Sequence, residues 1–271
     1  MITTNPFAEI SATISPEVMQ YYIIAMVFLV VGGTVIDMWH KKSAKFFFNN
    51  AKKAQENATR TVDGGEKISI AVKTAVEDVA LSGEFCNTKR RIAHLLTMYG
   101  FVIFVATTVI MIFNPPVEGD DMLPQLWHIG AIMLAIGSWW FWLFIRVDVA
   151  AEGNKWYNIE PMDLFSLSLM ATSAFALLWS YAGGWILFAL FIASSTILFG
   201  GVLWSKFAHM FFKPAAAYNK RMIKADGSNE NLPQPADRQN PADRDRHSME
   251  LLKDAPLDMG LGIKRDAPRH Y

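Results

Sequence analysis

Long apolar runs alternate with polar connections along most of this 271-residue chain. A helix needs about 20 consecutive apolar residues to cross the hydrocarbon core of a bilayer. Five stretches reach or approach that length, at 20–40, 92–113, 126–145, 164–182 and 185–212. The pattern therefore predicts an all-α integral membrane protein, built as a five-helix transmembrane bundle.

The first apolar run differs from a cleavable signal peptide. No basic residue precedes it, and Lys41 and Lys42 follow it in place of a cleavage site made of small residues. We therefore expect a retained helix as the first span, with residues 1–19 as an outer segment.

The distribution of Lys and Arg predicts the orientation of the bundle. Residues 1–19 and the connection 114–125 contain neither residue type, whereas 41–91, the short connection that holds Arg146, and the tail 213–271 all carry basic residues. Positively charged loops stay on the cytoplasmic side of a membrane. We expect the N-terminus outside and the C-terminus in the cytoplasm.

The cytoplasmic connection 41–91 contains an amphipathic pattern. Ile68, Val72, Val76 and Val79 recur at helical spacing among charged residues, which predicts a helix over about 67–81. Such a helix lies on the membrane surface or packs under the bundle. Docking of a soluble partner is the alternative.

The polar tail 213–271 has the composition of a segment that cannot bury a core from about residue 225 onward. Pro, Asp, Asn, Arg and Gln dominate it, so we expect disorder there. Its apolar islands at 249–252 and 259–263 either become ordered on a cytoplasmic partner or belong to an extension without function.

Composition and charge exclude several classes of protein. The formal net charge is zero, so the overall balance says nothing about partners; we separately expect no nucleic-acid partner. Cys86 is the single cysteine, which excludes an intrachain disulfide and any iron–sulfur or zinc site built on several thiolates of this chain. No arrangement of catalytic residues for hydrolysis is evident. The spans also lack paired midplane carboxylates and a repeated half, which argues against a transporter.

Two histidines carry the chemistry that this sequence predicts. His94 and His209 lie at the inner ends of the second and fifth spans, with Arg90 and Arg91 beside the first and Lys206 and Lys213 beside the second. A b-type haem with two histidine ligands lies between helices and directs its propionates toward a membrane face, where basic residues can pair with them. The alternative is that both imidazoles bond to carbonyls or lipid headgroups at the interface.

The other histidines have different surroundings. His128 opens the third span on the outer side, where a second haem with Met111 as partner ligand, a quinone contact or a plain interfacial role are all open. His40 ends the first span beside two lysines, and we interpret it as interfacial, with ligation as the alternative. His247 and His270 lie in the polar tail, where we expect them to be solvated.

Several short motifs resemble one family of membrane cytochromes. The segments 84–86, 90–94, 126–130 and 205–210 are similar to the membrane domain of the quinone-interacting membrane-bound oxidoreductase complex. That domain belongs with the membrane cytochromes of heterodisulfide reductases and the nitrate reductase gamma subunit. The similarity covers roughly 65–215, and 205–210 is its most specific part.

The resemblance covers the membrane domain of that family but not its iron–sulfur domain, and this difference implies a function. The quinone-interacting subunit of that family carries a cysteine-rich iron–sulfur domain, which this sequence lacks; in that respect the chain is similar to the membrane anchors of dissimilatory adenylylsulfate reductases. The resemblance then implies a cytoplasmic flavin and iron–sulfur adenylylsulfate reductase as partner, exchanging electrons with quinone in the bacterial inner membrane.

The same resemblance implies roles for individual residues. His94 and His209 become the axial ligands of one haem b, with Arg90, Arg91 and Lys206 facing its propionates. His128 matches a family position and stays a weaker site for a second haem or a quinone. The alternative function is a structural anchor without a cofactor, whose histidines only pack or bond at the interface.

Overall fold

Helices make up all the regular secondary structure that the computed structural model describes, over residues 3–85, 87–114, 122–148, 153–205, 207, 209–232 and 240–242. Five of them are long and apolar enough to cross a membrane: Pro16–His40, Thr88–Phe113, Met122–Ile145, Pro161–Ala182 and Trp185–Leu203. The prediction of an all-α membrane bundle is confirmed.

In chain order, the described helices are α1 (Pro6–Ile10), α2 (Pro16–Lys41), α3 (Ser43–Glu56), α4 (Gly64–Lys73), α5 (Thr88–Phe113), α6 (Met122–Trp140), α7 (Leu164–Ala182), α8 (Trp185–Gly200) and α9 (His209–Ala225). Two π-helical segments, η1 (Thr74–Ala80) and η2 (Phe141–Ile145), continue α4 and α6, and two 3₁₀ turns, η3 (Pro161–Asp163) and η4 (Gly201–Leu203), precede α7 and follow α8.

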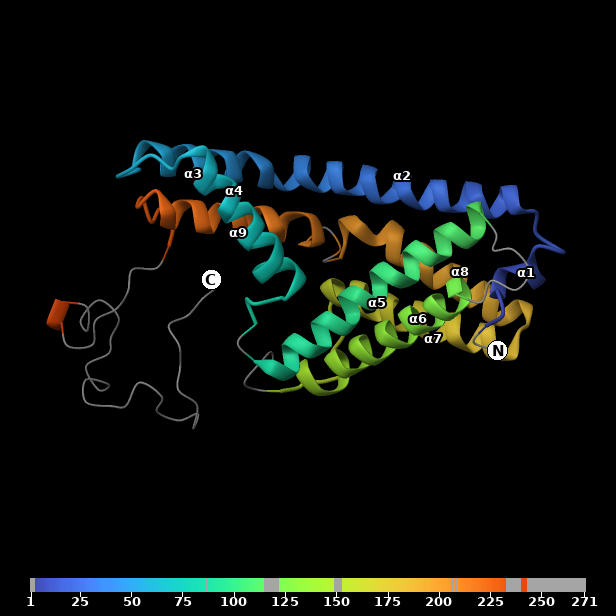
Figure 1. Cartoon of the computed structure of the whole chain (residues 1–271). Helices are drawn as coiled ribbons and strands as arrows, with labels where there is room; N and C mark the ends of the chain where they lie inside the picture. The colour runs from blue at the N-terminus through green and yellow to red at the C-terminus, as the bar shows by residue number, and fades with distance from the viewer. Residues whose placement is uncertain are drawn as a thin grey trace.

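The two ends of the bundle carry different elements. Figure 1 shows α1 at one end and α3, α4 and α9 extending from the other. We call these the outer and inner ends, after the predicted orientation, which itself stays a prediction. The connection 41–91 and the start of the tail therefore meet at one end of the bundle.

Glycines allow α5 and α6 to pack with their backbones in close contact. A Cβ atom on Gly130 would lie 2.6 Å from the backbone nitrogen of Phe104, and one on Gly137 would lie 2.6 Å from that of Thr97. Small residues at such crossings are typical of membrane helix pairs. This packing fixes the inner part of α5, which carries His94, against α6.

A buried arginine closes the connection between α6 and α7. The Arg146 side chain is 1% exposed and forms an ion pair with Asp163. Its guanidinium also donates hydrogen bonds to the carbonyl oxygens of Lys155, at 2.8 Å, and Asn158, at 2.7 Å. The Trp142 ring lies 4.3 Å from its guanidinium carbon. The charge is thus fully surrounded by acceptors and an aromatic face.

The segment 185–212, expected as one span, is divided in the structure. Helix α8 ends at Gly200, the η4 turn begins at Gly201, and α9 begins at His209. The Ser205 hydroxyl accepts a hydrogen bond from the backbone N–H of Phe207, at 3.2 Å. Paired glycines weaken a helix and a serine side chain offers the backbone another partner, which together explain the break. His209 therefore starts a new helix.

A helix covers the region predicted to be amphipathic, 67–81. It begins earlier, because the Asp63 carboxylate accepts a hydrogen bond from the backbone N–H of Glu66, at 2.8 Å, and caps the helix. The π-helical segment η1 extends it to Ala80. Among its apolar side chains Ile68 is 68% exposed, so part of the predicted apolar stripe is free of contact within the chain.

The tail is described only in part. Helix α9 occupies its first residues and ends at Ala225, and the description continues to Leu232 and resumes for 240–242. Most of the region that we expect to be disordered lies outside the described residues, as do both apolar islands, His247 and His270.

Candidate functional site

A cavity of about 300 Å³ lies at the inner end of the bundle, between α5, η1, α7 and α9. His94 and His209 both line it, so the structure brings together the two histidines that the sequence pairs. The polar and charged side chains in its walls are Asp78, Glu84, His94, Thr97, His209 and Lys213. The remaining walls are apolar and include Phe101 and Phe165.

The His94 ring is held by a serine that sequence analysis did not single out. Its Nδ1 lies 2.9 Å from the hydroxyl oxygen of Ser82, which is 1% exposed. Ser82 has a positive φ of 48°, in the turn between η1 and α5. The Phe85 ring packs on the imidazole at 4.8 Å between centroids. With Nδ1 engaged, Nε2 is the nitrogen suited to a metal.

His209 enters the cavity from the first residue of α9. Its ring packs edge-on against Phe165, with centroids 5.6 Å apart. Lys213 follows one turn later on the same helix, and its ammonium lies 3.0 Å from a carboxylate oxygen of Glu84. An aromatic wall and an ion pair therefore flank this imidazole.

The basic residues predicted around the site have separate positions. Arg90 lies over the Phe85 ring, 5.5 Å from its centroid, beside the cavity. Arg91 instead donates to the carbonyl oxygen of Leu81, at 2.7 Å, and thereby holds the turn rather than lining the cavity. Lys206 lies outside the described residues.

Lys213, which the sequence places beside His209 but which is not among the predicted propionate partners, is the cation that lines the cavity. Its spacing of four residues from His209 places both side chains on one face of a helix, which explains why both line the cavity. Ser82 offered no comparable signal, because its contact with His94 depends on a turn conformation.

His128 belongs to a different part of the molecule. It is buried in α6, with Nδ1 2.7 Å from the carbonyl oxygen of Pro124 and Nε2 2.6 Å from the hydroxyl oxygen of Ser180. A neutral imidazole satisfies both contacts if Nδ1–H donates to the carbonyl and the serine hydroxyl donates to Nε2. The ring therefore ties α6 to α7. His40, at the end of α2, is exposed.

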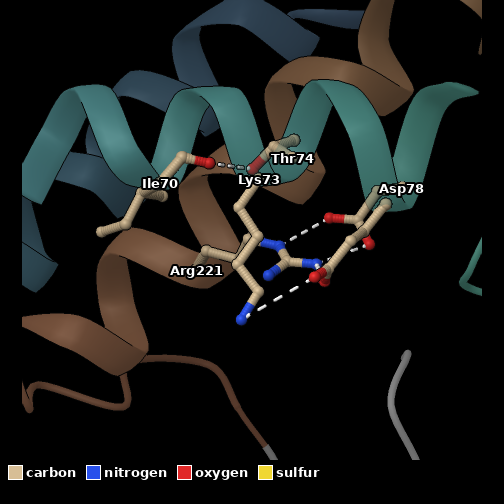
Figure 2. Close-up of polar contacts among 6 residues, drawn as sticks. Ile70, Lys73, Thr74, Asp78 and Arg221 are labelled. Atoms are coloured by element: carbon tan, nitrogen blue, oxygen red, sulfur yellow. Dashed lines mark hydrogen bonds and ion pairs between the residues drawn. The ribbon is translucent and has the colours of Figure 1, made fainter.

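An arginine on α9 fixes that helix against the π-helical wall of the cavity. The Arg221 guanidinium donates hydrogen bonds to Asp78, at 2.6 and 2.9 Å, and to Glu77, at 2.8 Å. Figure 2 shows Arg221 reaching from its helix to Asp78. Hydrogen bonding to Asp78 raises the pKa of Arg221, so its charge persists throughout the physiological range.

We expect Asp78→Asn to loosen α9. The substitution weakens two charge-assisted hydrogen bonds to Arg221 that are largely shielded from solvent, at a cost of about 1.5–3 kcal/mol. Amide hydrogen exchange over α9 should accelerate roughly tenfold or more. Lys73→Ala provides the control, since the Lys73–Glu77 pair is solvent-exposed and 3.9 Å long; it should leave exchange in α9 unchanged. Equal exchange in both variants would contradict this role of Asp78.

The residues of the cavity fit a haem with two histidine ligands. Two imidazoles from separate elements face one cavity, and a buried hydroxyl orients one of them. Aromatic rings provide flat walls, and the cations beside them are Arg90 and Lys213, the latter paired with Glu84. His128 does not line this cavity.

The fold and this cavity define a multi-pass helical membrane protein with a histidine-lined site at one end of its bundle. No family model, curated protein or solved structure matches the chain.

Proposed function

We propose that this protein is the membrane anchor and electron-transfer subunit of a cytoplasmic flavin and iron–sulfur adenylylsulfate reductase, which it links to the quinone pool of a bacterial inner membrane through one haem b. The observation that supports the proposal is the meeting of His94 and His209 in one cavity at the inner end. The identity of the partner is inferred from the resemblance of residues 65–215 to quinone-linked membrane cytochromes.

The chain's own residues have defined tasks in this proposal. His94 and His209 would hold the iron through their imidazoles, and Ser82 would keep the His94 ring in one orientation. Lys213 and Arg90 would offset the charge of the propionates. The apolar walls, with Phe101 and Phe165, would contact the faces of the haem ring. A bound haem b would supply one-electron transfer.

The overall reaction follows from the chemistry of the proposed partner. Sulfite forms a bond to the phosphate oxygen of AMP and loses two electrons, which yields adenylylsulfate. Quinone takes up the two electrons together with two protons and becomes quinol. Helices α3, α4 and α9 extend from the inner end, where a cytoplasmic enzyme would meet the anchor (Figure 1).

A structural anchor without a cofactor is the second function that a specific observation favours. His94 already bonds to Ser82 and packs on Phe85, and His209 packs on Phe165, so neither ring needs a metal to be held in place. In that case the cavity would only separate the helices that the partner contacts.

Quinone reduction in vesicles tests the proposed function. We expect vesicles that contain this chain and the reductase to reduce a quinone analogue only when sulfite and AMP are both supplied. Ser82→Ala should weaken haem binding about 10- to 100-fold, as the loss of other partners of ligand histidines does, and slow the reaction accordingly at limiting haem. The exposed His40→Ala is the control and should match wild type. Full activity in vesicles that lack the chain would disprove the proposal.

A further inference from the structure

A tight turn between α6 and α7 carries two aromatic residues at its corners. The backbone N–H of Asn158 donates to the carbonyl oxygen of Lys155, at 3.0 Å, which closes a turn with Trp156 and Tyr157 at its central positions. These two side chains are 61% and 59% exposed, and Ile159, directly after them, is 63% exposed. Turn corners are usually glycine, proline or small polar residues, so an exposed aromatic pair there is unusual. We call residues 155–159 the aromatic turn.

The buried Arg146 holds the aromatic turn at the end of a membrane span. Its guanidinium donates to the carbonyl oxygens of Lys155, at 2.8 Å, and Asn158, at 2.7 Å, the two end residues of the turn. Arg146 directly follows Ile145, the last residue of the third span. The turn therefore lies within the length of one arginine side chain of the end of that span. Since the fourth span begins soon afterwards, at Pro161, the turn is placed at the boundary of the hydrocarbon layer.

Exposed apolar side chains flank the aromatic turn in both adjoining spans. Leu143 and Phe144 are exposed near the inner end of the third span, and Met162 is exposed at the start of the fourth. Apolar side chains that remain exposed within a span face the lipid tails, because lipid is as apolar as they are. The apolar surface of the turn is thus continuous along the chain with surface that the bilayer covers.

We infer that the aromatic turn inserts Trp156 and Tyr157 into the headgroup region of the leaflet at the inner end. Rings that combine an apolar body with a polar N–H or O–H are enriched at this level of a membrane. The Lys155 ammonium lies 5.7 Å from the centroid of the Tyr157 ring, and such a cation is suited to lipid phosphates. Phe165, which follows on α7, lines the histidine cavity. The insertion would therefore fix the depth of that cavity in the membrane.

Spin labels on the full-length protein test the insertion in vesicles of phosphatidylcholine and phosphatidylglycerol. Cys86→Ser removes the single native thiol, and Trp156→Cys or Tyr157→Cys then provides one labelling position. Oxygen enters the hydrocarbon layer, whereas a polar nickel chelate stays in water. Phe144→Cys, at an exposed position inside the third span, is the lipid control. Lys52→Cys is the water control, because this side chain on α3 is 77% exposed.

The ratio of oxygen to nickel collisions at each label separates lipid from water. We expect the ratio at both corners of the turn to exceed that at the water control several-fold and to approach that at the lipid control. A ratio at either corner equal to that of the water control would overturn the insertion and would favour a soluble partner as the occupant of the turn. The inference goes beyond the proposed function and requires neither haem nor the reductase, so the two can fail separately.

Discussion

Replacement of Arg146 by alanine is expected to destabilise the protein by about 3–5 kcal/mol. The substitution leaves the buried Asp163 carboxylate without its cation and removes the donors for the carbonyl oxygens of Lys155 and Asn158. Each of these groups is then buried without a hydrogen-bond or ion-pair partner, which lowers the stability of the folded protein. Thermal unfolding of the purified protein in detergent should show a large fall in the midpoint.

The control for this prediction is an ion pair in solvent. Arg60 also forms two hydrogen bonds to one carboxylate, that of Glu66, but on the exposed surface before α4. Arg60→Ala should leave the unfolding midpoint close to that of wild type, because water replaces the lost partner. Similar midpoints for the Arg146 and Arg60 variants would show that burial of Arg146 contributes nothing to stability.

Substitution of Gly130 by valine should cost about 3 kcal/mol, through overpacking between α5 and α6. Any Cβ there would lie 2.6 Å from the Phe104 nitrogen and 3.1 Å from the Gly100 oxygen, and backbone atoms cannot move aside as a side chain can. The two helices must separate, which displaces the inner part of α5. We expect a much lower folded yield after size-exclusion chromatography.

Gly32 on α2 is the matched control for this substitution. A Cβ atom at Gly32 would meet nothing within 4 Å, so Gly32→Ala should be neutral or slightly stabilising, as alanine is a better helix former. If Gly130→Val folded as well as Gly32→Ala, close backbone contact between α5 and α6 would not be required.

The sequence was sufficient to predict the spans and the pairing of two histidines. Apolar runs of membrane length are a strong signal, because the bilayer imposes both length and composition. His94 and His209 could be placed on one side from the charge bias of the connections alone. Their meeting in one cavity follows from that topology and from the packing of α9, which carries His209, against η1.

The remaining features depend on contacts that a sequence pattern does not encode. The sequence pattern identifies Arg146 only as a basic residue of an inner connection, whereas the folded chain surrounds it with acceptors from a loop and from η3. The break before His209 and the turn that presents Ser82 arise from local backbone conformations.

Haem content of the purified protein, measured by a reduced-minus-oxidised spectrum with quantification per chain, decides whether the histidine cavity is a cofactor site. We expect a b-type spectrum with one haem per chain in wild type and in the His40→Ala control, and its loss in His94→Ala and in His209→Ala. A well-folded wild-type protein without haem, or undiminished haem in both cavity variants, would contradict the assignment.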